Sequence, residues 1–172
     1  MSSIRPCPLP PDALLAGYAA GGAFADCYTA EVARPVPHGS FIEAFYRGGL
    51  MRLERRLIGL ALSRPSTDAQ VRELAAGQTR EFSAWRVEHR TPNQLLMRDV
   101  GGRTRSWLMT VPEGANGTRL YFGSAVVPSV DRATGKSRMG FGFHALLGFH
   151  KLYSRLLLGA ALARLQAPEA RG

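Results

Sequence analysis

The fold is decided by residues 82–127, FSAWRVEHRTPNQLLMRDVGGRTRSWLMTVPEGANGTRLYFGSAVV. Apolar and polar side chains alternate with a period of two through most of this stretch, which is typical of half-buried β-strands. Turn signals interrupt the alternation at Pro92-Asn93, Gly101-Gly102 and Asn116-Gly117. The stretch therefore predicts an antiparallel meander of four strands, at residues 82–91, 94–100, 103–111 and 118–127.

The segment before the meander predicts one strand and a helical region. Residues 24–32 are mostly β-compatible, and a Pro-rich stretch ends them. Ser40 and Glu43 form a capping-box pattern, which predicts the start of a helix. Gly48-Gly49 should split this helix, and helical spacing resumes over residues 50–61.

Two further helices complete the predicted fold. A short helix over residues 68–76 is indicated by a second capping-box pattern at Thr67 and Gln70, with Gly77 suited to the position after the last turn. A final helix from about residue 141 to 165 carries a wide apolar arc that must be covered. This order predicts an α+β domain in which a curved antiparallel sheet wraps the long C-terminal helix.

The first 22 residues differ in composition from the rest of the chain. They contain Pro6, Pro8, Pro10, Pro11 and Gly21-Gly22. Prolines cannot donate backbone hydrogen bonds, so we predict a flexible arm without regular structure. The predicted organisation is an arm over residues 1–22 and a single domain over residues 23–172.

The net charge of +9 comes from 22 basic residues, of which only Lys136 and Lys151 are lysines. The basic residues are dispersed, and no short Lys/Arg-rich run marks a nucleic-acid patch. We therefore expect no nucleic-acid partner. Self-association is left open.

No stretch is apolar enough to span a membrane, because charged residues interrupt the C-terminal apolar segment. We expect a cytoplasmic protein. Its two cysteines, Cys7 and Cys27, are too few for a disulfide framework, and we expect reduced thiols.

The hairpin loops predict which side chains share a face of the meander. With two-residue loops, and an even-length loop before the fourth strand, the core face holds Trp85, Val87, His89, Leu96, Arg98, Val100, Arg103, Arg105, Trp107, Met109, Leu120, Phe122, Ser124 and Val126. Arg98 and Arg105 then lie directly opposite each other and repel. Three interpretations remain open: the guanidiniums reach solvent, pair with a carboxylate such as Asp26 or Glu43, or bind an anionic ligand.

The sequence carries no catalytic signature. It contains no GxSxG, P-loop or dinucleotide fingerprint. His144 and His150 lie well apart around the predicted helix, so we expect no metal site and no cofactor. His150 is a core histidine or a candidate general acid or base at the edge of the apolar arc.

The segment Phe149-His150-Lys151-Leu152-Tyr153-Ser154-Arg155, together with Trp85-Arg86-Val87-Glu88, resembles an uncharacterised family related to the START-like superfamily of polyketide cyclases and lipid-transport proteins. The resemblance extends from about Phe24 to Leu165. It implies a helix-grip fold with a cavity between the sheet and the C-terminal helix. It also implies seven strands where the pattern gives about five, so short strands are expected near Thr79–Phe82 or around Val100.

The predicted function is the binding of a small hydrophobic ligand, with or without an acidic group, between the sheet and the C-terminal helix. The candidate ligand-binding residues are Trp85, Arg98, Arg105, Trp107, Phe122, His150 and Tyr153. Two alternatives remain: a cyclase-like or hydrolase-like enzyme that uses His150, and a structural or interaction protein with a vestigial cavity.

Overall fold

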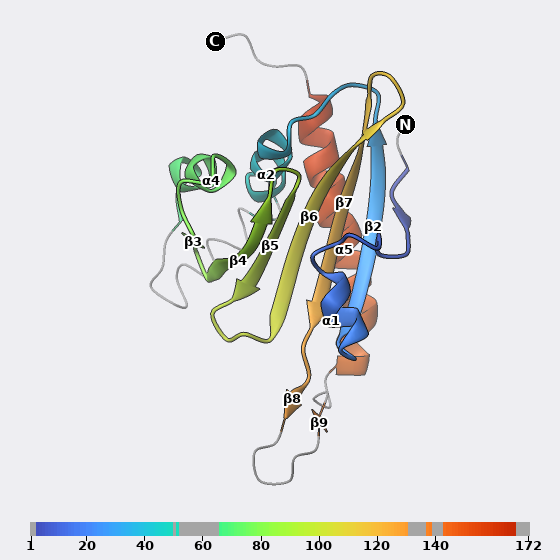
Figure 1. The fold of residues 1–172 in the computed structure, drawn as a ribbon, viewed down its shortest axis with the longest axis vertical. Coiled ribbons are helices and arrows are strands. Elements are labelled where there is room, and N and C mark those ends of the chain that lie inside the picture. The colour runs from blue at the N-terminus through green and yellow to red at the C-terminus, as the bar shows by residue number, and fades with distance from the viewer. Residues whose placement is uncertain (1–2, 50, 52–65, 131–136, 139–142, 168–172) are drawn as a thin grey trace.

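A computed structural model describes residues 3–49, 51, 66–130, 137–138 and 143–167 (Figure 1). At residues 129–130, 137–138 and 143–150 it describes the backbone only. The helical spacing predicted over residues 50–61 lies outside the described residues, except at Met51.

Seven strands form one antiparallel sheet in the order β1-β2-β7-β6-β5-β4-β3 (Figure 1). Their bounds are Arg5–Pro6 (β1), Phe24–Val32 (β2), Glu81–Phe82 (β3), Trp85–Thr91 (β4), Gln94–Asp99 (β5), Thr104–Glu113 (β6) and Gly117–Val126 (β7). A separate pair, β8 (Ser129–Val130) and β9 (Ser137–Arg138), follows the sheet. The predicted strand over 24–32 and the meander are confirmed, and β3 is one of the short strands that the pattern alone did not separate.

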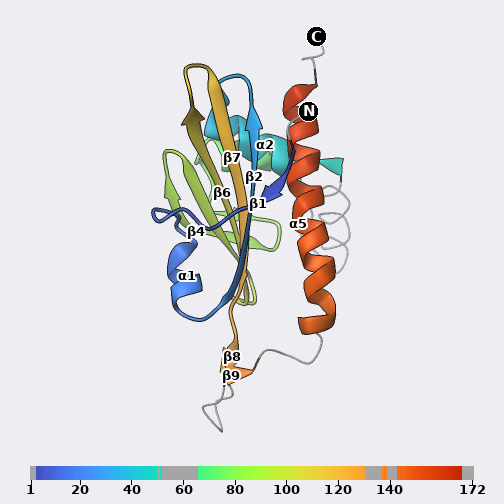
Figure 2. The same cartoon turned by 90° about the vertical axis from the view of Figure 1, so that its right-hand side faces the viewer.

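The helices are α1 (Ala16–Ala20), α2 (His38–Tyr46), α4 (Asp68–Ala75) and α5 (Phe143–Gln166). α5 runs along one face of the curved sheet and packs on α2, β2 and β7 (Figure 2). β1 lies at the edge of the sheet next to β2, and the segment that follows it, with α1, lies on the opposite face (Figure 2). The fold is therefore α+β and of the helix-grip type. None of the helices among the described residues is long and apolar enough to cross a membrane.

The face of the sheet toward α2 and α5, called here the inner face, carries the larger core. Strand residues such as Leu95, Met97, Leu108 and Phe122 are buried there against α2 and the C-terminal half of α5. Aromatic rings fill the centre: the ring centroids of Phe45 and Phe122 are 4.8 Å apart. This inner core holds the helices on the sheet.

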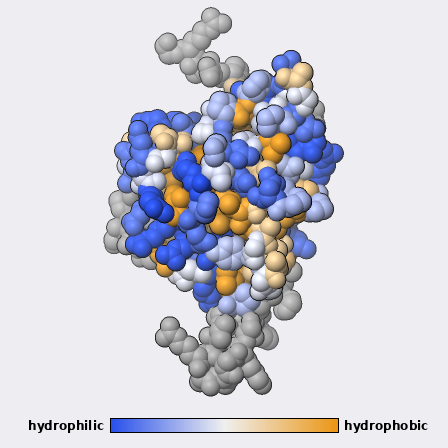
Figure 3. Space-filling model, in the orientation of Figure 1, coloured by the Kyte–Doolittle hydropathy of each residue, from blue (hydrophilic) through white to orange (hydrophobic). Residues whose placement is uncertain are grey.

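The opposite, outer face carries a second core that the arm covers. The outer core consists of Ala13, Leu15, Cys27, Leu96, Trp107, Met109 and Ala125. Leu15 and Trp107 have no exposed surface. Figure 3 views this side of the molecule and shows hydrophobic patches that remain between hydrophilic side chains.

The prediction that prolines exclude regular structure from the arm is wrong at two places. Arg5–Pro6 pair with β2, and Ala16–Ala20 form α1. The buried amide of Gln94 ties the arm down, because its Oε1 accepts a hydrogen bond from the Leu14 amide (2.9 Å) and its Nε2 donates to the Asp12 carbonyl (3.0 Å). The arm gains regular structure from contacts that are distant in sequence and that its local composition does not encode.

Two local irregularities overturn the predicted core face. A bulge in β4 lies at Glu88, between Val87 and His89, so Trp85 and Val87 change face relative to the prediction and pack on the inner core. Glu113 pairs with Gly117, so the loop between β6 and β7 has three residues rather than an even number. Phe122 therefore lies on the inner face, whereas Trp107 lies on the outer face.

The predicted capping box is present at α4 and absent at α2. Thr67 and Gln70 form the predicted capping box, and Gly77 follows α4 with a φ of 76°. The Ser40 box is wrong, because α2 begins at His38 behind Pro37 without a side-chain cap. Glu43 instead pairs with Arg47, with 3.3 Å between Oε2 and Nη1.

Candidate functional site

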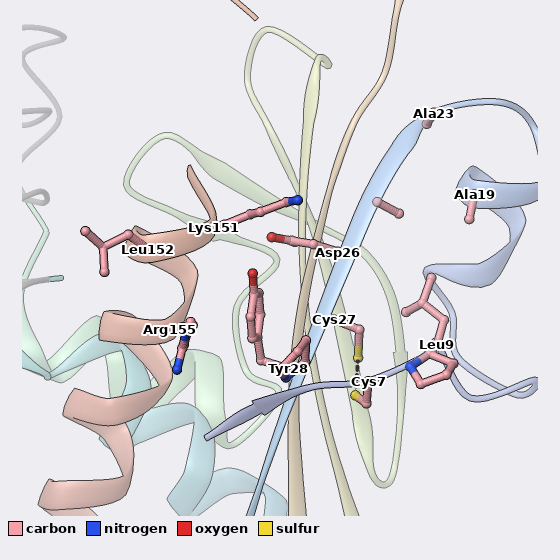
Figure 4. Close-up of a pocket in the computed structure, with 13 residues that line it drawn as sticks. Cys7, Leu9, Ala19, Ala23, Asp26, Cys27, Tyr28, Lys151, Leu152 and Arg155 are labelled. Carbon is pink, nitrogen blue, oxygen red and sulfur yellow. Dashed lines mark hydrogen bonds between the residues drawn. The ribbon is translucent and has the colours of Figure 1, made fainter. Parts of the chain in front are cut away.

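An open groove of about 710 Å³ lies where the arm, β2 and α5 meet (Figure 4). It is lined by Pro6, Cys7, Pro8, Leu9, Ala19, Ala23, Ala25, Asp26, Cys27, Tyr28, Lys151, Leu152 and Arg155. Most of these side chains are apolar, and the polar ones come from β2 and α5. This composition is typical of a ligand site.

The groove wraps around the edge of the sheet because β1 is very short. β1 pairs with Tyr28 and Thr29, and the Cys7 amide adds one hydrogen bond to the Cys27 carbonyl (3.0 Å). Side chains alternate along β2, so Tyr28 packs with the inner core and Cys27 with the outer core. Both sides of this strand therefore contribute to one groove.

The β2 side of the groove carries a carboxylate and a phenol. Asp26 Oδ1 accepts hydrogen bonds from the Ser124 hydroxyl (2.6 Å) and the Ser124 amide (3.2 Å). Burial raises the pKa of Tyr28, the Asp26 charge raises it further, and Arg155 lowers it. Tyr28 is thus a neutral hydroxyl that can donate a hydrogen bond into the groove.

The α5 side carries two cations, Lys151 and Arg155. They are one helical turn apart, so they project from the same side of α5. Both are exposed, and neither has an ion-pair partner within the described part of the chain. In Figure 4 the Lys151 ammonium, the Asp26 carboxylate and the Tyr28 hydroxyl point into the same part of the groove. The arrangement can receive an anion next to an apolar surface.

Two thiols lie where the arm crosses β2. Cys7 Sγ is 3.3 Å from Cys27 Sγ. Burial raises the pKa of both thiols, more strongly for Cys27. They are therefore protonated near neutral pH, and neither is an activated nucleophile.

The predicted paired arginines have different surroundings. Arg98 and Arg105 do lie opposite each other, but Arg98 is exposed and Arg105 is buried. Arg105 Nε lies 2.8 Å from a Glu88 carboxylate oxygen, and the guanidinium stacks 4.6 Å from the centroid of the Tyr18 ring. Tyr18 in turn donates a hydrogen bond to Glu88. For Arg105 the structure bears out the carboxylate partner, which is Glu88 rather than Asp26 or Glu43. For Arg98, which is exposed, it bears out the interpretation that the guanidinium reaches solvent.

The predicted ligand-binding residues do not converge on one pocket. Trp85, Phe122 and Tyr153 pack with the inner core. Trp107 lies in the outer core, where its indole Nε1 donates to Gln94 (2.8 Å). The His150 side chain lies outside the described residues, so its role stays a prediction.

The residues that line the groove were mostly missed by the sequence reasoning. Lys151 and Arg155 have the spacing of a helical pair, but nothing in the sequence indicates that they face β2. Cys7 was placed in a flexible arm. The extended Pro6-Cys7-Pro8 segment was the available signal, because prolines on both sides favour an extended cysteine that can pair with a strand.

His38, a half-buried polar residue, lies on the inner side at the start of α2. His38 Nδ1 is 3.4 Å from the Thr110 hydroxyl. Burial, with a smaller contribution from Arg90, lowers the pKa of His38 from 6.5 to about 4. His38 is therefore neutral in the folded protein near pH 7, and its charging opposes folding in acid.

Comparisons with known proteins assign neither a family nor a site to this chain. No protein-family model and no curated protein sequence matches the chain. Among solved structures, the crystal structure of CalU16 from Micromonospora echinospora matches over 97% of this chain and 98% of that chain, at 14% identity and a TM-score of 0.35. This similarity is too low to assign a site or a ligand. Among the described residues, no group of three or more His, Cys, Asp or Glu side chains could hold a metal ion.

Proposed function

We propose that this protein binds a small molecule with an apolar body and one acidic group, in the groove between the arm, β2 and α5. The observation that carries the proposal is the pair of cations, Lys151 and Arg155, beside an apolar lining. The proposal narrows the ligand class predicted from the sequence to acids. It also moves the binding site from the space between the sheet and the C-terminal helix to the edge of the sheet.

The apolar body would lie on the arm and on the exposed side of α5. Pro6, Pro8 and Leu9 line the groove from the arm, and Leu152 lines it from α5. Leu152 is 56% exposed, which is unusual for a leucine on a helix that packs on a sheet. A ligand that covers these side chains would remove apolar surface from water, which contributes a favourable free energy of about 25 cal/mol per Å² buried.

The acidic group would lie between α5 and Tyr28. Lys151 and Arg155 supply charge, and the neutral Tyr28 hydroxyl supplies a hydrogen-bond donor. Asp26 is the one carboxylate among the lining residues, and Ser124 already donates two hydrogen bonds to it. The lining therefore has one more positive than negative charge, which favours an anion over a cation.

The test uses decanoate, decanol and decyltrimethylammonium as matched probes, with isothermal titration calorimetry on the full chain. We expect decanoate to bind more tightly than decanol, and decyltrimethylammonium to bind least. Arg155→Met should weaken decanoate about fivefold, because one charge-assisted contact at an open site contributes about 1 kcal/mol. Arg164→Met, an exposed change on the last turn of α5 and outside the groove, is the control and should leave binding unchanged.

Equal affinities for decanoate and decanol would contradict the role of the cations. Equal losses in Arg155→Met and Arg164→Met would mean that the net charge of the protein, rather than the groove, attracts the anion. Binding that survives in Lys151→Met/Arg155→Met at full strength would place the ligand elsewhere.

A further inference from the structure

The two cysteines of the chain meet although 20 positions separate them. Their sulfur atoms are 3.3 Å apart, so closing to a disulfide bond of about 2.05 Å requires a movement of only about 1.2 Å. Both are free thiols. No other cysteine in the sequence competes for either one.

The backbone already has the geometry that a disulfide needs. The Cys7 amide donates to the Cys27 carbonyl at 3.0 Å, which continues the β1-β2 ladder by one position. Directly opposed residues of an antiparallel pair have Cα atoms about 4.5–5.5 Å apart, within the range of about 4.4–6.8 Å found in disulfides. Pro8 biases Cys7, the residue before it, toward an extended conformation, and the ring of Pro6 fixes φ at the preceding position.

We propose that Cys7 and Cys27 are a dithiol modification site, which exchanges with small-molecule disulfides of the glutathione type to form a reversible intrachain disulfide. The proposal does not depend on the ligand proposed above, because both thiols are present in the free protein.

The order of the two steps follows from exposure. Cys7 is half-buried, whereas Cys27 is only 5% exposed. Cys7 loses its proton to solvent, its thiolate attacks one sulfur of the small disulfide, and the first small thiolate leaves and takes up a proton. Cys27 then loses its proton, attacks Cys7 Sγ and expels the second small thiolate, which is protonated in turn. Overall, two protein thiols are oxidised to one disulfide, and one small disulfide is reduced to two thiols.

The surrounding charges predict how the exchange responds to pH. Burial raises the pKa of Cys7, while Arg5 and Arg119 lower it. Burial and the nearby charge of Asp26 raise the pKa of Cys27. Because exchange requires the thiolate, its rate should increase as the pH rises from neutral into the alkaline range.

The disulfide would fix the arm on the sheet. Residues 7–27 contain the outer-core contacts of Ala13 and Leu15 as well as α1. Cross-linking the ends of this segment lowers the entropy of its open states and so makes local opening rarer. Cys7 and Cys27 also line the groove, so oxidation would change its wall.

The test incubates the full-length protein in glutathione buffers of increasing oxidised fraction and records intact masses and free thiols. We expect a monomer that is lighter by two hydrogen atoms, with both thiols lost together and restored by dithiothreitol. Cys27→Ser should accumulate a glutathione adduct at Cys7, and Cys7→Ser should remain unmodified at Cys27. Amide hydrogen exchange in residues 7–23 should slow by on the order of tenfold or more in the oxidised wild type.

A lasting glutathione adduct on Cys7 of the wild type would overturn the proposal, as would covalent dimers or thiols that stay free in fully oxidised buffer. The wild-type masses decide this point even if a serine variant fails to fold. If the oxidised protein binds decanoate as tightly as the reduced protein does, the disulfide still forms as proposed. Only the expected effect of oxidation on the groove would then be contradicted.

Discussion

The inner and outer faces of the sheet are covered in different ways. The inner core lies under helices whose apolar spacing is visible in the sequence. The outer core lies under an arm of about 20 residues whose regular structure is limited to β1 and the five residues of α1, and polar contacts hold the arm in place. Gln94 binds the arm backbone, and Tyr18 joins Glu88 and Arg105. A segment rich in proline can therefore be part of a core when the sheet supplies its hydrogen-bond partners.

Of the changes considered, removal of residues 1–22 should lower the stability of the protein most. It would expose Leu96, Trp107 and Met109, which are at most 3% exposed in the full chain. We expect the free energy of unfolding to fall by about 4 kcal/mol or more, since each large buried side chain contributes about 1.5–3 kcal/mol. Urea denaturation of the full and shortened chains measures this. An unchanged midpoint would mean that the arm is the flexible appendage that its composition predicts.

Gly123→Ala tests the closest contact between arm and sheet. A Cβ atom at Gly123 would lie 2.9 Å from the Asp26 carbonyl oxygen and 2.9 Å from Leu15 Cδ2. The backbone oxygen cannot move aside without disturbing β2, so we expect a loss of about 2–3 kcal/mol in urea denaturation. Gly17→Ala is the matched control in α1, where nothing lies within 4 Å of the new Cβ. It should stabilise the protein by about 0.5–1 kcal/mol, and equal effects of both changes would contradict close packing of Leu15 on β7.

Protonation of His38, on the inner side of the sheet, should make the stability of the fold sensitive to acid. Its folded pKa of about 4 lies below the unfolded value of 6.5, so the unfolded chain binds more protons between these values. The stabilisation is complete above the unfolded pKa and is lost as the pH falls toward the folded pKa. We expect a loss of about 2 kcal/mol from about pH 7.5 to about pH 5.

His38→Gln should flatten this pH dependence, whereas His89→Gln, at an exposed position of β4, should not. Urea midpoints across the pH range provide the measurement. The same slope in wild type and His38→Gln would show that other groups cause the acid sensitivity.

The smallest expected stability changes come from substitutions at the two facing arginines, Arg105 and Arg98. Arg105→Met removes the partner of Glu88, and we expect a loss of about 1–2 kcal/mol, because Glu88 is still 27% exposed and keeps the Tyr18 hydroxyl. Arg98→Met, directly opposite and exposed, should change stability by no more than about 0.5 kcal/mol. Thermal denaturation of the two variants distinguishes them. A stabilised Arg105→Met would mean that the repulsion between the arginines outweighs the ion pair with Glu88.

The elements of the fold were predictable, and the assignment of side chains to faces was not. The period of two located the meander, the β-compatible run before a Pro-rich stretch located β2, and the Thr67 capping box located α4. The bulge at Glu88 and the three-residue loop before Gly117 each shift the strand register by one residue, so that the side chains on one side of the shift lie on the opposite face of the sheet. No residue type marks either feature unambiguously. The predicted pocket therefore joined side chains from opposite faces, such as Trp107 and Phe122.

The groove was less predictable because contacts between distant segments create it. Lys151, Tyr28 and Cys7 belong to a helix, a strand and an arm, and only the β1-β2 pairing and the position of α5 bring them together. Gly123, a glycine inside a strand, was one sequence signal for a close approach, since such glycines often mark a site where another chain segment comes near.

The most direct test of the groove is photo-crosslinking with a decanoate analogue that carries a diazirine on its alkyl chain, followed by peptide mapping of the full chain. We expect label on the arm around residues 6–9 and on α5 around residues 151–155, suppressed by excess decanoate and not by decanol. Label confined to α4 or to β4 and β5, or label that excess decanoate does not suppress, would contradict an acid-binding groove at the edge of the sheet.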